Sequence, residues 1–165
     1  MTNNDILKRI RYAFDFSNQR AVELFSLDPA SSVDITVDQF TSKLTKEEEP
    51  EFSPCTDVEF AAFLDGLIVS KRGLREPPNN SNSSSPQEKP SDYKLSKNDI
   101  LKKLRIAMNF REQEMLTTLK LGGSILSKAE LSALFRKPGH KHFRGCGNQI
   151  LRNFIKGLTM QLRET

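Results

Sequence analysis

The feature that most constrains the fold is an internal repeat, in which two segments of the chain align almost without gaps. Residues 4–8 read Asn-Asp-Ile-Leu-Lys, and the same five residues recur at 98–102. Further matches at this offset pair Arg11, Ala13, Phe16, Gln19 and Leu27 with Arg105, Ala107, Phe110, Gln113 and Leu121. After a three-residue difference in length, a second constant offset pairs Phe52, Cys55, Phe63, Gly66 and Leu67 with Phe143, Cys146, Phe154, Gly157 and Leu158. Matches at fixed offsets on apolar and structural positions indicate a duplicated domain.

Each copy is predicted to form four short helices, so the expected fold class is all-α. Apolar residues recur at helical spacing, and strand-like alternation is nowhere sustained. The third helix of each copy opens with a capping box, at Thr36 and at Ser127. The remaining helices are expected at about residues 4–16, 19–27 and 57–72, with counterparts at about 113–121 and 148–163.

Two glycines stand inside the predicted fourth helices. Gly66 and Gly157 occupy matching positions, where Gly costs about 1 kcal/mol relative to Ala. Their presence in both copies predicts a close helix crossing. A copy of this size is near the lower limit at which one core suffices, so docking of the copies or oligomerisation would add stability.

The segment between the copies has the composition of a flexible tether. Residues 75–90 contain four prolines and no apolar residue that could be buried, a composition typical of disorder. We therefore divide the chain into a first helical repeat at residues 1–74, a disordered linker at 75–94 and a second helical repeat at 95–165.

The two copies differ steeply in charge. Residues 1–76 carry 9 Lys and Arg against 14 Asp and Glu, whereas residues 93–165 carry 15 against 5. The net charge of +4 for the whole chain hides this contrast between an acidic repeat and a basic one.

The contrast is sharpest in the connection between the third and fourth helices. Residues 46–52 read Lys-Glu-Glu-Glu-Pro-Glu-Phe, whereas the corresponding part of residues 136–147 is rich in Lys, Arg and His. The fourth helix of the second copy adds two cations four residues apart, hence on one face. The candidate nucleic-acid-binding residues are Arg136, Lys137, His140, Lys141, Phe143, Arg144, Arg152 and Lys156.

Three interpretations of this basic segment compete. It can be a solvated surface loop, which needs no partner. It can bind phosphates, with Lys and Arg neutralising charge and Phe143 or His140 contacting a base. It can also dock on an acidic protein surface, including the acidic first repeat of this chain.

Metal and enzymatic interpretations have less support in the sequence. His140, His142 and Cys146 offer only three ligands, whereas structural zinc takes four. Cys146 aligns with Cys55, which no histidine accompanies, so both are better explained as small buried hydrophobes. No set of residues meets the requirements of an active site. We expect no metal, no cofactor and no catalysis.

The sequence also predicts a cytoplasmic protein. No apolar run approaches the roughly 20 residues needed to cross a bilayer, and the N-terminus lacks the pattern of a signal peptide. In a reducing cytosol the two cysteines should remain thiols.

The basic segment is also where the chain resembles a known family. Residues 136–152, together with the matches around residues 4–12, 63–73 and 102–107, are similar to the YehS-like bacterial proteins. In that family the segment reads approximately H-K-N-F-R-E-C-G-D-Q, and this chain differs by carrying His142, Gly145 and Asn148. Two acidic groups are therefore absent here. The resemblance implies the duplication and a bacterial cytosolic setting, and it implies no activity, because the family is one of unknown function.

From the sequence we expect a tandem all-α protein without catalysis. The leading hypothesis is regulatory binding of RNA or DNA through the second repeat, with the acidic repeat covering the basic surface when no nucleic acid is present. The alternative is a protein-interaction adaptor or self-associating protein whose acidic and basic surfaces dock within or between chains. The sequence leaves the partner and the oligomeric state open.

Overall fold

The computed structural model describes residues 1–73 and 92–163, and within them the chain is entirely helical apart from turns and connections. The helices of the first repeat are α1 (Asn3–Ala13), α2 (Asn18–Leu27), α3 (Val37–Leu44) and α4 (Asp57–Arg72). Those of the second are α5 (Lys97–Met108), α6 (Glu112–Leu121), α7 (Lys128–Leu134) and α8 (Asn148–Arg163). The predicted all-α fold and its duplication are confirmed. Most of the predicted linker, residues 75–91, lies outside the described residues.

The order of helices is the same in both repeats, and their boundaries correspond to within one residue. α4 and α8 cover the residues that the sequence predicted. α1 ends three residues earlier than expected, because Asp15 adopts a left-handed conformation with φ of 54°. Asn109 repeats this conformation after α5. Asp and Asn tolerate that region better than most residues, and the chain turns there into the second helix of each repeat.

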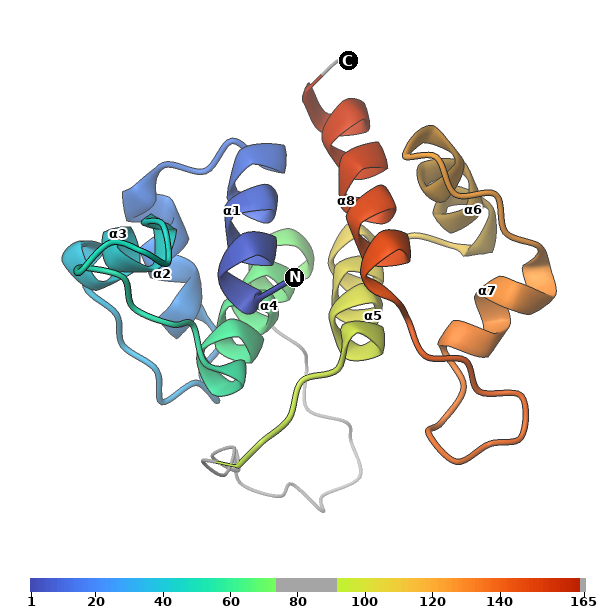
Figure 1. The fold of residues 1–165 in the computed structure, drawn as a ribbon, viewed down its shortest axis with the longest axis horizontal. Coiled ribbons are helices and arrows are strands. Elements are labelled where there is room, and N and C mark those ends of the chain that lie inside the picture. Colours follow the sequence, from blue (N-terminus) through green and yellow to red (C-terminus); the bar gives the residue numbers. More distant parts are fainter. Residues whose placement is uncertain (74–91, 164–165) are drawn as a thin grey trace.

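The two repeats share one hydrophobic core. Each first helix packs mainly against the fourth helix of the other repeat: α1 against α8, and α5 against α4. Figure 1 shows these four helices side by side at the centre of the molecule, running in the same direction. α2 and α3 cover one side of this central group, and α6 and α7 cover the other. The repeats therefore dock on each other through their most apolar surfaces.

Polar contacts fix both ends of the central group. At the N-terminal end, Asn3 Nδ2 donates to Asp57 Oδ1 at 2.7 Å, and the backbone N–H of Leu95 donates to Asp57 Oδ2 at 2.9 Å. At the C-terminal end, Arg163 pairs with Asp15 at 3.3 Å. Parallel helices place like ends of their dipoles side by side, so these ends repel each other. Asp57 at the N-terminal end and Arg163 at the C-terminal end reduce that repulsion, because each carries the charge opposite to the local end of the dipole.

The glycines of the fourth helices lie at close helix crossings, as predicted. A Cβ added at Gly66 would stand 1.7 Å from the carbonyl oxygen of Leu24 in α2. One added at Gly157 would stand 1.9 Å from the carbonyl oxygen of Thr118 in α6. Only glycine lets the two backbones approach this closely, so each crossing sets the position of the second helix on the fourth.

One buried position is charged in the first repeat and apolar in the second. Lys43 is buried in the first repeat and pairs with Glu59 at 3.2 Å. The residues at the matching positions of the second repeat are Leu134 and Ile150. An ion pair in the first repeat and two apolar residues in the second therefore occupy equivalent positions. Replacing a buried ion pair by apolar residues often leaves the free energy of unfolding unchanged or raises it.

We predict that Gly66→Ala and Gly157→Ala each destabilise the protein by at least about 2 kcal/mol, because the added methyl group overlaps a backbone carbonyl that cannot move alone. This loss outweighs the gain in helix propensity of about 1 kcal/mol. Chemical denaturation of the full chain measures the change. Gly145→Ala is the control, since a Cβ there meets nothing within 4 Å, and unchanged stability in the Gly66 variant would contradict the assigned crossing.

We also predict that neither repeat folds alone as a stable monomer. A fragment of residues 1–73 would expose the face of α1 that packs on α8, and a fragment of residues 92–165 would expose the face of α5 that packs on α4. Mixing the two fragments should restore helicity and give a one-to-one complex, measurable by circular dichroism and light scattering. Two cooperative, monomeric fragments that do not bind each other would show that the shared core is not needed.

Candidate nucleic-acid interface

The basic connection, residues 136–147, joins α7 to α8 and has a defined backbone. The N–H of His140 donates to the carbonyl of Lys137 at 3.0 Å, and that of Phe143 to the carbonyl of His140 at 2.9 Å. The N–H of Arg144 then donates to the carbonyl of Ala133 at 3.0 Å and closes the base of the connection. Two successive turns held at their base present the side chains in a fixed arrangement.

The acidic connection, residues 45–56, repeats this backbone in the first repeat. The N–H of Glu49 donates to the carbonyl of Lys46 at 3.0 Å, and that of Phe52 to the carbonyl of Glu49 at 3.1 Å. Ser53 closes the base through a bond to the carbonyl of Ser42 at 3.2 Å. Every one of these bonds lies at the position that the repeat offset gives. The two connections are therefore one backbone frame with opposite charges.

A single asparagine fastens each connection to the first helix of its own repeat. The Nδ2 of Asn98 donates to the carbonyls of Leu134 and Arg144, each at 2.9 Å. Its Oδ1 accepts the N–H of Cys146 at 2.8 Å. One side chain thus holds both ends of the basic connection, because its amide supplies donors and an acceptor at once.

Asn4 makes the same three bonds in the first repeat. It donates to the carbonyls of Lys43 and Ser53 at 2.9 and 3.0 Å, and it accepts the N–H of Cys55 at 2.9 Å. In the sequence, the repeated asparagine stands out only as part of the alignment of the two copies. Its presence in both copies was the signal that could have revealed this role.

The predicted site residues fall into two groups. Arg136, Lys137, His140, Lys141 and Arg144 are exposed on the basic connection, and Phe143 is half-buried beside them. Arg152 and Lys156 lie apart from the connection, on successive turns of α8. The structure brings the first group together on one frame and leaves the second on the helix that follows it.

Few of these cations have an acidic partner. Arg144 pairs with Glu130 at 3.2 Å, and a backbone hydrogen bond from Ser127 lowers the pKa of Glu130, which keeps it an anion. Among the described residues, no ion pair is recorded for Arg136, Lys137 or Lys141. Their charge is therefore available to a partner.

The N-terminus of α8 adds to the positive potential. The first turns of the other three central helices carry acidic residues: Asp5 in α1, Asp57 and Glu59 in α4, and Asp99 in α5. The first turn of α8 carries none. Carboxylates in the first turn offset the positive end of a helix dipole, so α8 keeps that end uncompensated next to the basic connection.

A hollow lies at the foot of the basic connection, lined by Arg105, Glu112, Leu131, Ser132, Phe135 and Arg136. The guanidinium of Arg105 lies over the ring of Phe135, 4.7 Å from its centroid. Its Nε donates to the carbonyl of Phe110 at 3.2 Å. The matching Arg11 in the first repeat instead donates to Asn18 at 2.9 Å. The second repeat thus has an arginine-aromatic pair beside its basic connection that the sequence analysis did not single out.

The histidines and cysteines do not gather into a metal-binding group. The rings of His140 and His142 lie 5.6 Å apart, and the N–H of His142 donates to Nδ1 of His140 at 3.1 Å. Within residues 1–73 and 92–163, no three His, Cys, Asp or Glu side chains are placed to hold a metal ion.

Both cysteines are free and buried, in agreement with their interpretation as small hydrophobes. Burial raises the pKa of the Cys146 thiol to about 11, and that of Cys55 to about 12. At neutral pH both therefore stay protonated, whereas nucleophilic and metal-binding cysteines need a thiolate.

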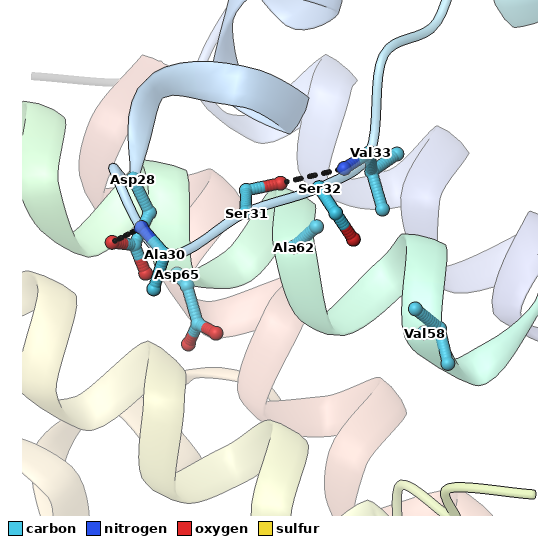
Figure 2. A pocket seen from close by; sticks show the side chains of 8 residues that line it. All are labelled: Asp28, Ala30, Ser31, Ser32, Val33, Val58, Ala62 and Asp65. Atoms are coloured by element: carbon cyan, nitrogen blue, oxygen red, sulfur yellow. Dashed lines mark hydrogen bonds between the residues drawn. The ribbon is translucent and has the colours of Figure 1, made fainter. Parts of the chain in front are cut away.

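A second hollow lies in the first repeat, between the α2–α3 connection and α4. Figure 2 shows Asp28 and Asp65 near each other at its rim, with Ser31 and Val33 joined by a hydrogen bond. Asp28 accepts the N–H of Ala30 at 3.0 Å, and Asp65 pairs with Lys103 of α5. Its acidic groups are thus occupied by contacts that hold the fold.

The acidic and basic connections lie on opposite sides of the central helices (Figure 1). Within one chain, the acidic connection therefore does not cover the basic one. The hypothesis that the acidic repeat covers the basic surface therefore gains no support from these two connections, because the repeats dock through their apolar faces. None of the helices in the described part of the chain is both long and apolar enough to cross a membrane.

We predict that Asn98→Ala costs about 2–3 kcal/mol of folding free energy, at roughly 1 kcal/mol for each of three lost hydrogen bonds. It should also loosen the basic connection selectively. Hydrogen exchange of the full chain should show faster exchange in residues 136–147 than in 45–56, and Asn4→Ala should reverse this order. Exchange that stays equal in both connections would contradict the role of the asparagines.

Comparison with known proteins places these features in context. A family model described as "Protein of unknown function (DUF1456)" matches residues 3–73 and again residues 97–164. The uncharacterized protein YehS of Escherichia coli (strain K12) is 37% identical over 158 residues, which cover 96% of this chain and 94% of that protein. No solved structure matches the chain. The two matched segments coincide with the two repeats.

Proposed function

The chain belongs to the DUF1456 family of proteins of unknown function. For this member of the family, we propose a non-enzymatic protein that binds RNA or DNA through its basic second repeat. The contacts would come from Arg136, Lys137, His140, Lys141, Phe143 and Arg144 on the basic connection, and from Arg152 and Lys156 on α8. Lys and Arg supply affinity for the phosphate backbone by releasing its counterions.

The observation that carries this proposal is the reversal of charge on a shared backbone frame. Both connections have the same length, the same turns and the same asparagine fastening. The fold therefore needs neither set of charges, since opposite sets fit the same frame. Cations that a fold does not need, and that lack acidic partners, support binding to an external polyanion.

Two neighbouring features support the same proposal. The uncompensated N-terminus of α8 raises the positive potential beside the connection. The hollow at its foot adds Arg105, stacked on the half-buried Phe135. Aromatic and guanidinium planes are the groups on which unpaired bases stack.

We further propose that the protein works without catalysis and resides in the cytoplasm. The thiols that an enzyme could use are buried and protonated. Two free cysteines in separate repeats are compatible with a reducing compartment.

The second candidate is a self-associating or adaptor protein. Its support is the placement of the acidic and basic connections on opposite sides of the molecule, which is the arrangement that head-to-tail association between chains requires. Sedimentation at low and high salt separates the two candidates, because self-association would give oligomers without nucleic acid that dissociate as salt screens the charges.

The test of the proposed function is a triple variant, Arg136→Gln, Lys137→Gln and Lys141→Gln, of the full chain. Fluorescence anisotropy with labelled oligonucleotides should show weaker binding. The slope of log affinity against log salt should fall by about 2 for single strands, at roughly 0.7 for each phosphate contact removed.

The matched control is Lys94→Gln, Lys120→Gln and Lys128→Gln, which removes the same charge from exposed positions elsewhere in the second repeat. It should lose much less affinity and keep its salt slope. Equal losses in both triple variants would reduce the effect to net charge, and a wild-type chain that binds no oligonucleotide at low salt would refute the proposal.

A further inference from the structure

α1 and α8 lie side by side along a line of contact (Figure 1). Both helices carry cations near this line. At its C-terminal end, the guanidinium of Arg163 lies over the ring of Tyr12, 4.2 Å from the centroid. Arg163 also donates to the carbonyl of Tyr12 at 2.9 Å and pairs with Asp15 at 3.3 Å. These contacts show which side of each helix borders the line of contact.

Helical spacing places three more cations on that side. Arg9 precedes Tyr12 by three residues, and Lys156 precedes Arg163 by seven, so both project on the same faces as the contact above. Arg152 lies on α8 one turn before Lys156. Arg9 and Lys156 are exposed, and no ion pair is recorded for either among the described residues. We call Arg9, Tyr12, Arg152, Lys156 and Arg163 the α1/α8 seam.

The equivalent line of contact between α5 and α4 has a different charge pattern. There Lys103 forms an ion pair with Asp65. The repeat offsets align Lys103 with Arg9 and Asp65 with Lys156. By the symmetry of the repeats, the positions that hold an ion pair at the α5/α4 contact hold two cations at the α1/α8 contact. Such a pair repels when it is empty and attracts a bridging anion.

The α1/α8 seam also has an exposed aromatic ring. Tyr12 is 58% exposed, whereas the residue at its matching position in the second repeat is the half-buried aliphatic Ile106. Asp15 is engaged by Arg163. Asp5, one turn before Arg9, accepts the N–H of Thr2 at 3.1 Å and marks the end of the positive stretch.

We propose that the α1/α8 seam binds a single-stranded nucleic acid, with phosphates at Arg9, Arg152 and Lys156 and a base stacked on Tyr12. This inference rests on the proposed function and extends it from the second repeat to both. Stacking is available only from unpaired bases, which selects single strands over duplexes. The surface exists only because the two repeats dock, so the duplication itself creates the binding path.

The decisive variant is Lys156→Asp, which copies the charge pattern of the α5/α4 contact into the seam. The new carboxylate should pair with Arg9, so the thermal midpoint of the full chain should stay the same or rise. Affinity for a labelled 20-nucleotide oligo(dT) at 50 mM salt should nevertheless fall roughly tenfold, since one phosphate contact is lost and a repulsive charge is gained. A purely structural role would move the two measurements together.

Lys128→Asp is the matched control. It makes the same change in net charge on α7, in the first turn of the helix, where an acid is favourable. Lys128 is 77% exposed, and its pair with Glu112 at 3.9 Å is a surface contact that contributes little. Its affinity for oligo(dT) should remain within about twofold of the wild-type value, because salt screens distant charges.

The intrinsic fluorescence of the chain gives an independent readout of stacking. The sequence contains two tyrosines and no tryptophan, so a Tyr93→Phe variant reports on Tyr12 alone. Oligo(dT) should quench its emission. Tyr12→Phe should bind as tightly as the wild type, because phenylalanine also offers a π-face, whereas Tyr12→Ala should bind about fivefold to a hundredfold more weakly.

The outcomes separate this inference from the proposed function. If the wild type binds no oligonucleotide, both fail. If the triple variant of the basic connection binds weakly while Lys156→Asp and Tyr12→Ala bind as the wild type does, the seam is refuted and Lys156 is removed from the proposed interface. Binding through the basic connection then stands. Equal affinity for duplex and single strand, without quenching of Tyr12, would also overturn the seam.

Discussion

The apolar faces of α1 and α5 are covered mainly by the fourth helix of the opposite repeat, and every other feature of the molecule is arranged around that exchange. Ile6, Leu7 and Ile10 of α1 and their counterparts in α5 are buried in a core to which both repeats contribute. A repeat of about 70 residues gains a core of adequate size by sharing it. The four central helices must then run parallel, and their ends bring together like partial charges.

This parallel arrangement explains where charge is tolerated. Acidic residues lie in the first turns of α1, α4 and α5, and basic residues lie in the last turns of all four central helices, each opposing the local helix dipole. α8 departs from the pattern at its N-terminus, where the basic connection arrives. Among the four central helices, the one N-terminus without an acidic residue therefore adjoins the basic connection, and this coincidence supports the proposed interface.

The asparagine fastening explains how the two connections could diverge. Asn4 and Asn98 each bind the backbone, not the side chains, of the connection they hold. Backbone bonds are indifferent to side-chain charge, so the connections could become acidic or basic without altering their shape. The α5/α4 and α1/α8 contacts differ in the same way. Asp65 and Lys156 occupy equivalent positions, but Asp65 forms an ion pair with Lys103, whereas Lys156 is a cation opposite the position of another cation, Arg9. One duplicated frame thus presents two electrostatically distinct surfaces.

The sequence by itself determined the duplication, the eight helices of the described residues, the boundaries of α4 and α8, and the close crossings at Gly66 and Gly157. These follow from local periodicity and from matches between the copies, which need no knowledge of distant contacts. Only the tertiary structure decided that α1 packs on α8, that the two connections lie on opposite sides, and that Arg163 lies over Tyr12. The apolar stripe of a helix shows that it must be buried but does not name its partner, because the fourth helix of either repeat offers a similar apolar surface.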